Sequence, residues 1–88
     1  MVKRIEFTET AAFWLLRKDF VTEDVIISVI EDFPTSRRIP QEKDCFKIEF
    51  RRRKRWVTVW VHEYPEKLLV YKLHSSSKLL KKINKNFL

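Results

Sequence analysis

The sequence predicts an α+β protein in which two helices come first and an antiparallel sheet follows. Apolar residues recur at helical spacing within residues 8–33, and strand-like alternation runs from residue 45 to residue 74. The chain has 88 residues, which is enough for one domain with one hydrophobic core. We therefore expect a single domain over residues 1–88, with the element order β-α-α-β-β-β-α.

A short strand and a capped helix are predicted at the N-terminus. Residues 3–7 alternate charged and apolar side chains, which places Ile5 and Phe7 on one face of a strand. Thr8 is a suitable N-cap, because its hydroxyl can accept from the free amides of the first helical turn. The helix is expected to end near Asp19. Its apolar stripe is formed by Ala11, Ala12, Leu15 and Leu16, and Phe13 and Trp14 widen this stripe beyond what a surface helix needs.

A second helix and a loop are predicted next. Thr22 caps the helix, and Pro34 ends it because proline disfavours helical backbone in the preceding residue. The apolar residues of this helix, at helical spacing, are Val25, Ile26, Val29, Ile30 and Phe33. Residues 34–43 contain two prolines and no periodicity, which indicates a loop.

Three strands and a last helix are predicted in the C-terminal half. The inward residues of the first two strands are Phe46, Ile48, Phe50, Val57, Val59 and Val61. The other face of the second strand carries Trp56, Thr58, Trp60, His62 and Tyr64. Residues 51–55 are the expected hairpin connection, and residues 64–67 form a turn with proline at its second position. A third strand covers residues 68–74, and the serines at 75–77 are expected to cap the helix.

Positive charge is concentrated in the same half. Residues 1–44 contain seven Lys and Arg against nine Asp and Glu, a net charge of −2, whereas residues 45–88 contain twelve against three, a net of +9. Five of these cations are consecutive: Arg51, Arg52, Arg53, Lys54 and Arg55. A polyanion that neutralises such a run releases counterions and gains affinity. The alternative interpretation is a solvated turn whose charges protect a sheet edge.

Aromatic side chains adjoin this basic run. Trp56, Trp60 and Tyr64 stand four residues apart on one strand face, and His62 lies between the last two. Exposed aromatic rings beside arginines form a stacking surface for unpaired bases. Packing in the core and a dimer interface use the same residue types, so both alternatives stay open.

Composition excludes several kinds of site. The chain has no glycine, which excludes Gly-rich phosphate loops and dinucleotide fingerprints. One cysteine, Cys45, and two histidines lack the spacing of metal ligands, so we expect no metal and no cofactor. No apolar stretch approaches the roughly 20 residues of a membrane span. The alternating N-terminus is not typical of a signal peptide, and we expect a cytoplasmic protein without membrane contact.

The order of elements resembles that of the small DUF4258-type domains, which are similar to distant members of the RelE/ParE toxin superfamily. The segments that carry the resemblance are 5–11, Arg17, 20–25, 29–32, 55–61 and 70–74. It implies a RelE-like fold, with an N-terminal strand and two helices packed on a twisted antiparallel sheet, plus a C-terminal helix. Thr10 stands where these domains usually carry a histidine, so any role of that histidine is absent here.

The resemblance also implies a function. In the toxin members the concave sheet face binds messenger RNA on the ribosome and cleaves it by phosphate stabilisation and acid–base transfer. The residues that match such catalytic roles by position are Arg55, Tyr71, Lys72 and His74. The residues expected to bind nucleic acid are Arg51, Arg52, Arg53, Lys54, Trp56, Trp60, His62 and Tyr64. The expected partners are RNA rather than DNA, the ribosome, and either an acidic antitoxin or a second copy of the chain.

Three functions are thus compatible with the sequence. The first is an RNA-directed, toxin-like protein that acts as an endoribonuclease. The second is a non-catalytic nucleic-acid-binding module that uses the same basic and aromatic surface. The third is a protein-interaction module, as a dimer or as the partner of an antitoxin. Binding to nucleic acid is common to the first two and is the function that we expect.

Overall fold

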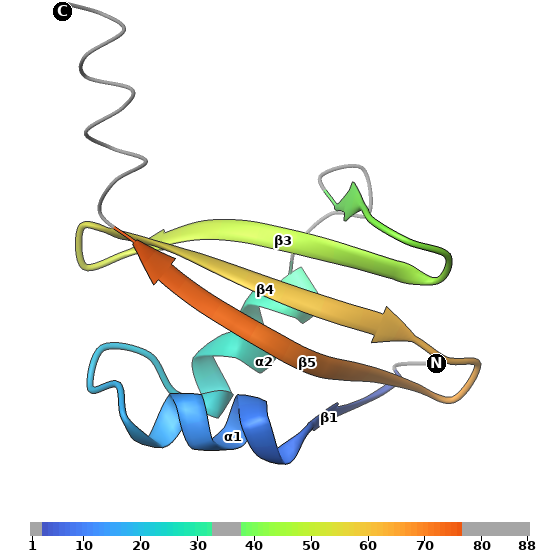
Figure 1. Cartoon of the computed structure of the whole chain (residues 1–88), viewed down its shortest axis with the longest axis horizontal. Coiled ribbons are helices and arrows are strands. Elements are labelled where there is room, and N and C mark those ends of the chain that lie inside the picture. Colours follow the sequence, from blue (N-terminus) through green and yellow to red (C-terminus); the bar gives the residue numbers. More distant parts are fainter. Residues whose placement is uncertain (1–2, 33–37, 77–88) are drawn as a thin grey trace, which may run out of the picture.

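The computed structural model describes residues 3–32 and 38–76 of the chain. Its elements are β1 (Arg4–Phe7), α1 (Glu9–Leu16), α2 (Glu23–Asp32), β2 (Ile39–Pro40), β3 (Cys45–Arg52), β4 (Arg55–Glu63) and β5 (Lys67–Ser76). The predicted α+β class is confirmed (Figure 1). The predicted C-terminal helix lies outside the described residues.

The five strands form one mixed sheet in the order β1-β5-β4-β3-β2. Strands β2 to β5 are antiparallel neighbours, but β1 runs parallel to β5, with Ile5 beside Leu68 and Phe7 beside Val70. The prediction of a wholly antiparallel sheet is therefore wrong. Alternation within a strand shows which side chains are inward, but it carries no information about the direction of the neighbouring strand.

Both helices begin after threonine caps, as predicted. Thr8 Oγ1 accepts a hydrogen bond from the amide of Ala11 at 3.2 Å, and Thr22 Oγ1 accepts from Val25 at 3.3 Å. Helix α1 ends at Leu16 rather than near Asp19, and Leu16 is 84% exposed. The predicted stripe is confirmed at Ala11 and Leu15, which are buried, and is wrong at Leu16, because residues 11–16 are all apolar and their spacing alone does not fix the buried face.

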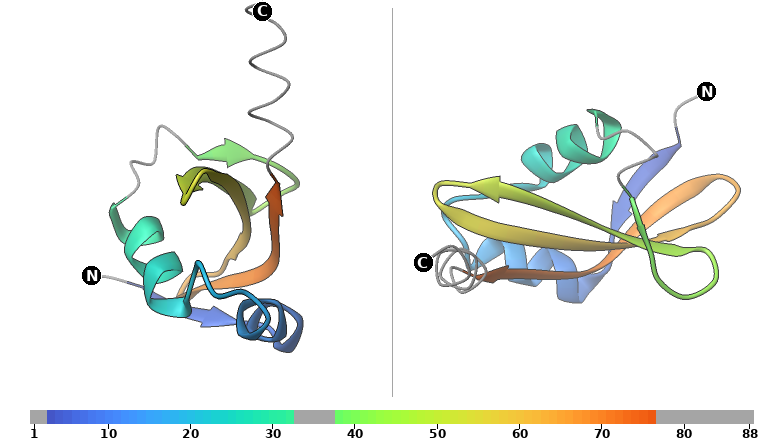
Figure 2. Two further views of the ribbon diagram at one scale, coloured as in Figure 1. Left: turned by 90° about the vertical axis from the view of Figure 1, so that its left-hand side faces the viewer. Right: turned by 90° about the horizontal axis from the view of Figure 1, so that it is seen from above.

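The core lies between the helices and one face of the sheet. Helix α2 lies on this side, α1 lies along the β5 edge of the sheet, and the sheet curls around α2 (Figure 2). The predicted inward residues of β3 and β4 pack in this core or against it, and the three β4 valines are fully buried. The buried residues are Ala11, Leu15, Phe20, Val21, Ile26, Ile30, Phe46, Ile48, Val57, Val59, Val61, Leu68, Val70 and Leu73.

A β-bulge in β5 changes which side chains point inward. Trp60 lies opposite Lys72, whereas Val61 lies opposite Val70, so Tyr71 is the extra residue. Without the bulge, Lys72 would share the inward face with Val70. With it, Leu73 is buried and Lys72 is exposed on the other face.

Two connections differ from the prediction. The β3–β4 hairpin has only two residues in its turn, because Arg52 already pairs with Arg55. Residues 51, 52 and 55 thus lie in strands, and the prediction of 51–55 as the connection is wrong. The predicted loop 34–43 contains the two-residue strand β2, and β5 extends to the serines at 75 and 76. The helix that residues 75–77 were expected to cap lies outside the described residues.

The hairpin turn itself has an unusual sequence for its backbone. Arg53 and Lys54 have φ angles of 51° and 68°, and positive φ at both central positions is the conformation of a type I′ turn. For a non-glycine residue, this left-handed backbone conformation costs roughly 1–2 kcal/mol of free energy, because the Cβ atom crowds the carbonyl oxygen.

We therefore expect the double substitution Arg53→Asn, Lys54→Gly to raise the free energy of unfolding by about 1–2 kcal/mol. Urea unfolding followed by circular dichroism measures the change, and high salt separates it from relief of charge repulsion. Arg51→Asn, which removes one cation of the basic run from a strand position, is the control and should not stabilise. A double variant no more stable than this control would contradict the strained turn.

Candidate nucleic-acid interface

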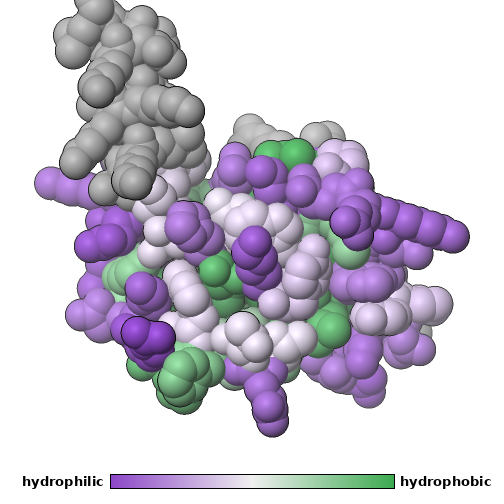
Figure 3. Space-filling view, in the orientation of Figure 1, coloured by the Kyte–Doolittle hydropathy of each residue, from purple (hydrophilic) through white to green (hydrophobic). Residues whose placement is uncertain are grey.

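The sheet face turned away from the helices, here named the open face, carries aromatic and basic side chains. Its members on β4 are Trp56, Thr58, Trp60 and His62. Strand register places Lys47 and Lys72 on either side of Trp60, and Arg51 beside Trp56. Figure 3 views this face: side chains of intermediate hydropathy occupy its middle and hydrophilic ones surround them.

Trp60 and Lys72 form the centre of the open face. The Lys72 Nζ atom lies 4.6 Å from the centre of the Trp60 ring, within the range of a cation–π contact. Among the described residues Lys72 has no carboxylate partner, whereas Lys47 pairs with Glu49 at 3.5 Å. The indole face and the unpaired ammonium group thus lie together at the surface.

A second aromatic pair lies where β4 ends. The rings of His62 and Tyr64 are stacked, with centroids 4.3 Å apart and planes 11° from parallel. Lys67 Nζ lies 5.3 Å from the Tyr64 ring centre and also pairs with Glu6 at 3.3 Å. The predicted turn brings Tyr64 and Lys67 together through a backbone hydrogen bond of 2.9 Å.

The basic tip, residues 51–55, is exposed along its whole length. Its side chains divide between the two faces. Arg51 is on the open face, whereas Arg52 and Arg55 reach the helix side, where both contact Phe20: Arg52 Nε donates to its carbonyl oxygen at 3.0 Å, and Arg55 Cζ lies 5.3 Å from its ring. None of the five cations pairs with a carboxylate of the described residues.

The four residues predicted to be catalytic are not all brought together. Lys72 and His74 lie on the open face, with His74 opposite Thr58 in the register. Arg55 lies near Phe20 on the other face, and Tyr71 lies at the bulge. The resemblance implied a concave binding face, but here α2 occupies the hollow side of the sheet and the aromatic residues are on the opposite face (Figure 2).

Tyr71 is the one described residue whose acidity is clearly altered. Partial burial raises the pKa of its phenol above the ordinary value of 10.0, and a hydrogen bond with Cys45 and the nearby Glu42 raise it further. The bulge and strand β3 thus meet through Tyr71 and Cys45. Since the phenol stays protonated at neutral pH, it is a hydrogen-bond donor on this part of the molecule.

This shift gives stability a defined pH dependence. The folded state retains the Tyr71 proton more firmly than the unfolded state. The contribution of this proton to the free energy of unfolding is therefore complete below about pH 10, and it is lost as the pH rises through the higher pKa of Tyr71 in the folded state. A Tyr64→Phe variant leaves Tyr71 as the only tyrosine, and its phenolate absorbance should titrate above pH 10.0. Adding Cys45→Ala should lower the midpoint. A midpoint at or below 10.0 would contradict this prediction.

Sequence reasoning overlooked some contributors to the open face. Lys47 alternates with the inward residues Phe46 and Ile48, which indicates the open face, but Lys47 was not predicted to be part of the site. Lys67 is the last residue of the predicted turn 64–67, where strand alternation does not show on which face a side chain lies. No prediction pointed to Cys45 and Tyr71 as partners, since the bulge that places Tyr71 has no signal in the sequence.

Other kinds of site find no support in these segments. Among residues 3–32 and 38–76, no three His, Cys, Asp or Glu side chains gather as metal ligands would. In the same segments no helix has the length and apolar character needed to cross a bilayer.

Comparison with protein family models, curated proteins and solved structures finds no match to this chain. The resemblance to RelE/ParE toxins stays a prediction.

Proposed function

We propose that the protein binds single-stranded RNA through the open face and the basic tip. The observation that carries the proposal is the indole of Trp60 at the surface, with the unpaired ammonium group of Lys72 4.6 Å from its ring. Stacking on an aromatic side chain contributes about 1–3 kcal/mol per base, without sequence preference. A flexible lysine can move from the ring to a neighbouring phosphate when a base stacks there.

The basic tip supports the same partner. Its five exposed cations have no carboxylate partners among the described residues, so a polyanion gains the full benefit of counterion release. Aromatic stacking needs bases that are not already stacked in a duplex, which favours single strands. The preference for RNA over DNA rests on the resemblance to RelE/ParE toxins.

A dimer through the open face is the competing use of this surface. Interface cores are depleted of charged residues. A two-fold contact would instead bring together the unpaired Lys72 and Arg51 of both copies, and the Glu49 carboxylate on this face is already paired with Lys47. Charge thus favours an anionic partner.

RNA cleavage is a separate proposal. Arg55 contacts Phe20 on the helix side of the sheet, whereas Lys72 and His74 lie on the open face and can contact a phosphate there.

The test is a titration with a single-stranded RNA of about 12 nucleotides, in which tryptophan fluorescence reports binding. We expect quenching, and an affinity that falls steeply between about 50 and 200 mM salt. If each cation of the tip neutralises one phosphate, the slope of log affinity against log salt is roughly −3 to −4.

Arg53→Gln with Lys54→Gln should reduce the magnitude of this slope by about one to two. The matched control is Arg17→Gln with Lys18→Gln, which removes two cations just after the end of α1, where they lie near Phe13 and Trp14. Binding that is absent at low salt, or independent of salt, would overturn the proposal. Incubation with ribosomes and message then shows whether binding is accompanied by cleavage that His74→Ala abolishes.

A further inference from the structure

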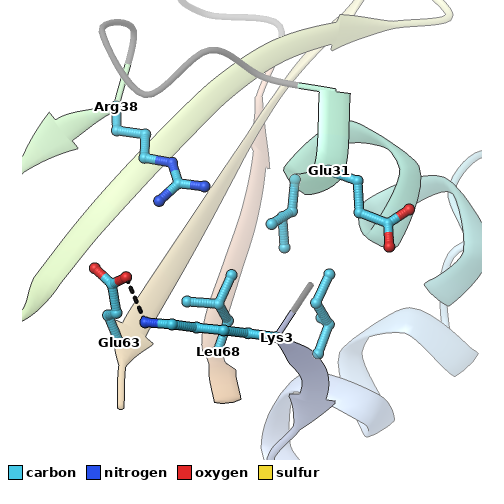
Figure 4. A pocket seen from close by; sticks show the side chains of 7 residues that line it. Lys3, Glu31, Arg38, Glu63 and Leu68 are labelled. Atoms are coloured by element: carbon cyan, nitrogen blue, oxygen red, sulfur yellow. Dashed lines mark hydrogen bonds and ion pairs between the residues drawn. The ribbon is translucent and has the colours of Figure 1, made fainter. Parts of the chain in front are cut away.

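A pocket lies on the helix side of the sheet, between α2 and β1. Its volume is about 470 Å³, and its lining residues are Lys3, Ile5, Ile30, Glu31, Arg38, Glu63 and Leu68 (Figure 4). Glu63 and Leu68 flank the β4–β5 turn, so the pocket is at the opposite end of β4 from the basic tip. Its size is in the range of small-molecule sites.

The charges of the pocket leave one cation uncompensated. Lys3 is neutralised by Glu63, with Nζ and Oε2 2.7 Å apart. Figure 4 shows the guanidinium group of Arg38 directed into the pocket, whereas the Glu31 carboxylate points away from it. Among the described residues Arg38 forms no ion pair, and its buried Nε has no hydrogen-bond partner.

A buried, unpaired guanidinium N–H calls for an acceptor. The Arg38 group is held in place by the ring of Phe46, 4.4 Å from its Cζ atom. A planar guanidinium group binds a carboxylate with two parallel hydrogen bonds. Ile5, Ile30 and Leu68 also line the pocket and offer an apolar surface to the rest of a ligand.

We propose that this pocket binds a small organic carboxylate with a branched aliphatic body. One unpaired cation matches one negative charge, and the apolar wall matches the hydrocarbon part. Inorganic phosphate has no apolar part and carries more charge than Arg38 alone compensates. The site is separate from the open face, so the inference does not depend on RNA binding.

The experiment compares 4-methylpentanoate with its neutral analogue 4-methylpentanamide, using the full chain. Methyl resonances of Ile5, Ile30 and Leu68 should shift and saturate with the acid, and the amide should bind about tenfold more weakly or worse. This comparison needs no variant, so it stands even if a change at Arg38 impairs folding. Equal affinity for acid and amide, or stronger binding of inorganic phosphate, would overturn the proposal.

Variants then assign the charge to Arg38. Arg38→Gln should lower the affinity for the acid by about tenfold. Arg38→Lys keeps the charge but loses the two parallel hydrogen bonds of the guanidinium group, and it should lower the affinity less. Arg53→Gln removes an arginine at the far end of the hairpin and should leave the affinity unchanged. Thermal unfolding confirms that each variant is folded. Undiminished binding by a folded Arg38→Gln protein would contradict the assignment.

Discussion

Replacing Ile48 with alanine is expected to lower the free energy of unfolding by about 3–4 kcal/mol. Ile48 is fully buried on β3, opposite Val59 of the central strand. The truncation removes three carbons from a site enclosed by helix and sheet residues, so both the lost burial and the remaining cavity contribute. A domain of this size has a total stability of only about 5–15 kcal/mol, so the loss is a large fraction of it.

Ile39→Ala is the matched control for this change. Ile39 lies in the two-residue edge strand β2 and is 39% exposed, so the same truncation should lower the free energy of unfolding by less than about 1 kcal/mol. Urea denaturation of both variants measures the difference. Similar losses at the two positions would mean that the core does not lie between the helices and the inward face of β3.

Replacing Trp60 with alanine is expected to weaken RNA binding by about tenfold or more, because one stacked base contributes about 1–3 kcal/mol. The same change also removes the ring beside which Lys72 is held. Trp60 is only partly buried and points away from the core, so the loss of stability should be much smaller than for Ile48→Ala. Anisotropy of a labelled oligonucleotide measures binding, and circular dichroism measures folding.

Two controls separate stacking from other effects. Trp60→Phe keeps an aromatic ring and should retain most of the affinity. Trp14→Phe alters a tryptophan that packs against the core from α1 and should leave binding unchanged. Unaltered RNA affinity in a folded Trp60→Ala protein would rule out stacking at the centre of the open face.

Local patterns were sufficient for the helix starts and for two strands. The caps at Thr8 and Thr22 depend on a hydroxyl three residues before an amide, which is a short-range interaction. In β3 and β4 a strict two-residue period separated inward from outward side chains, because the backbone there contains no bulge. The same period placed Trp60 and His62 on the open face and thereby predicted the aromatic part of the candidate site.

The remaining predictions were limited by interactions between distant residues. Six consecutive apolar residues in α1 offered little contrast, so the predicted stripe contained Leu15, which is buried, but also Leu16, which is exposed. The basic run was treated as one surface, although a two-residue turn sends Arg51 and Arg55 to opposite faces.

The amino-acid sequence alone therefore determined the α+β class, the helix caps and the inward faces of β3 and β4, since each depends on neighbours within a few residues. Tertiary structure decided the parallel pairing of β1 with β5, the bulge that turns Lys72 outward, and the pocket in which Arg38 lacks a partner. The first and the third join segments that are tens of residues apart, and the bulge depends on how β5 pairs with β4. Periodicity within one strand does not encode such contacts.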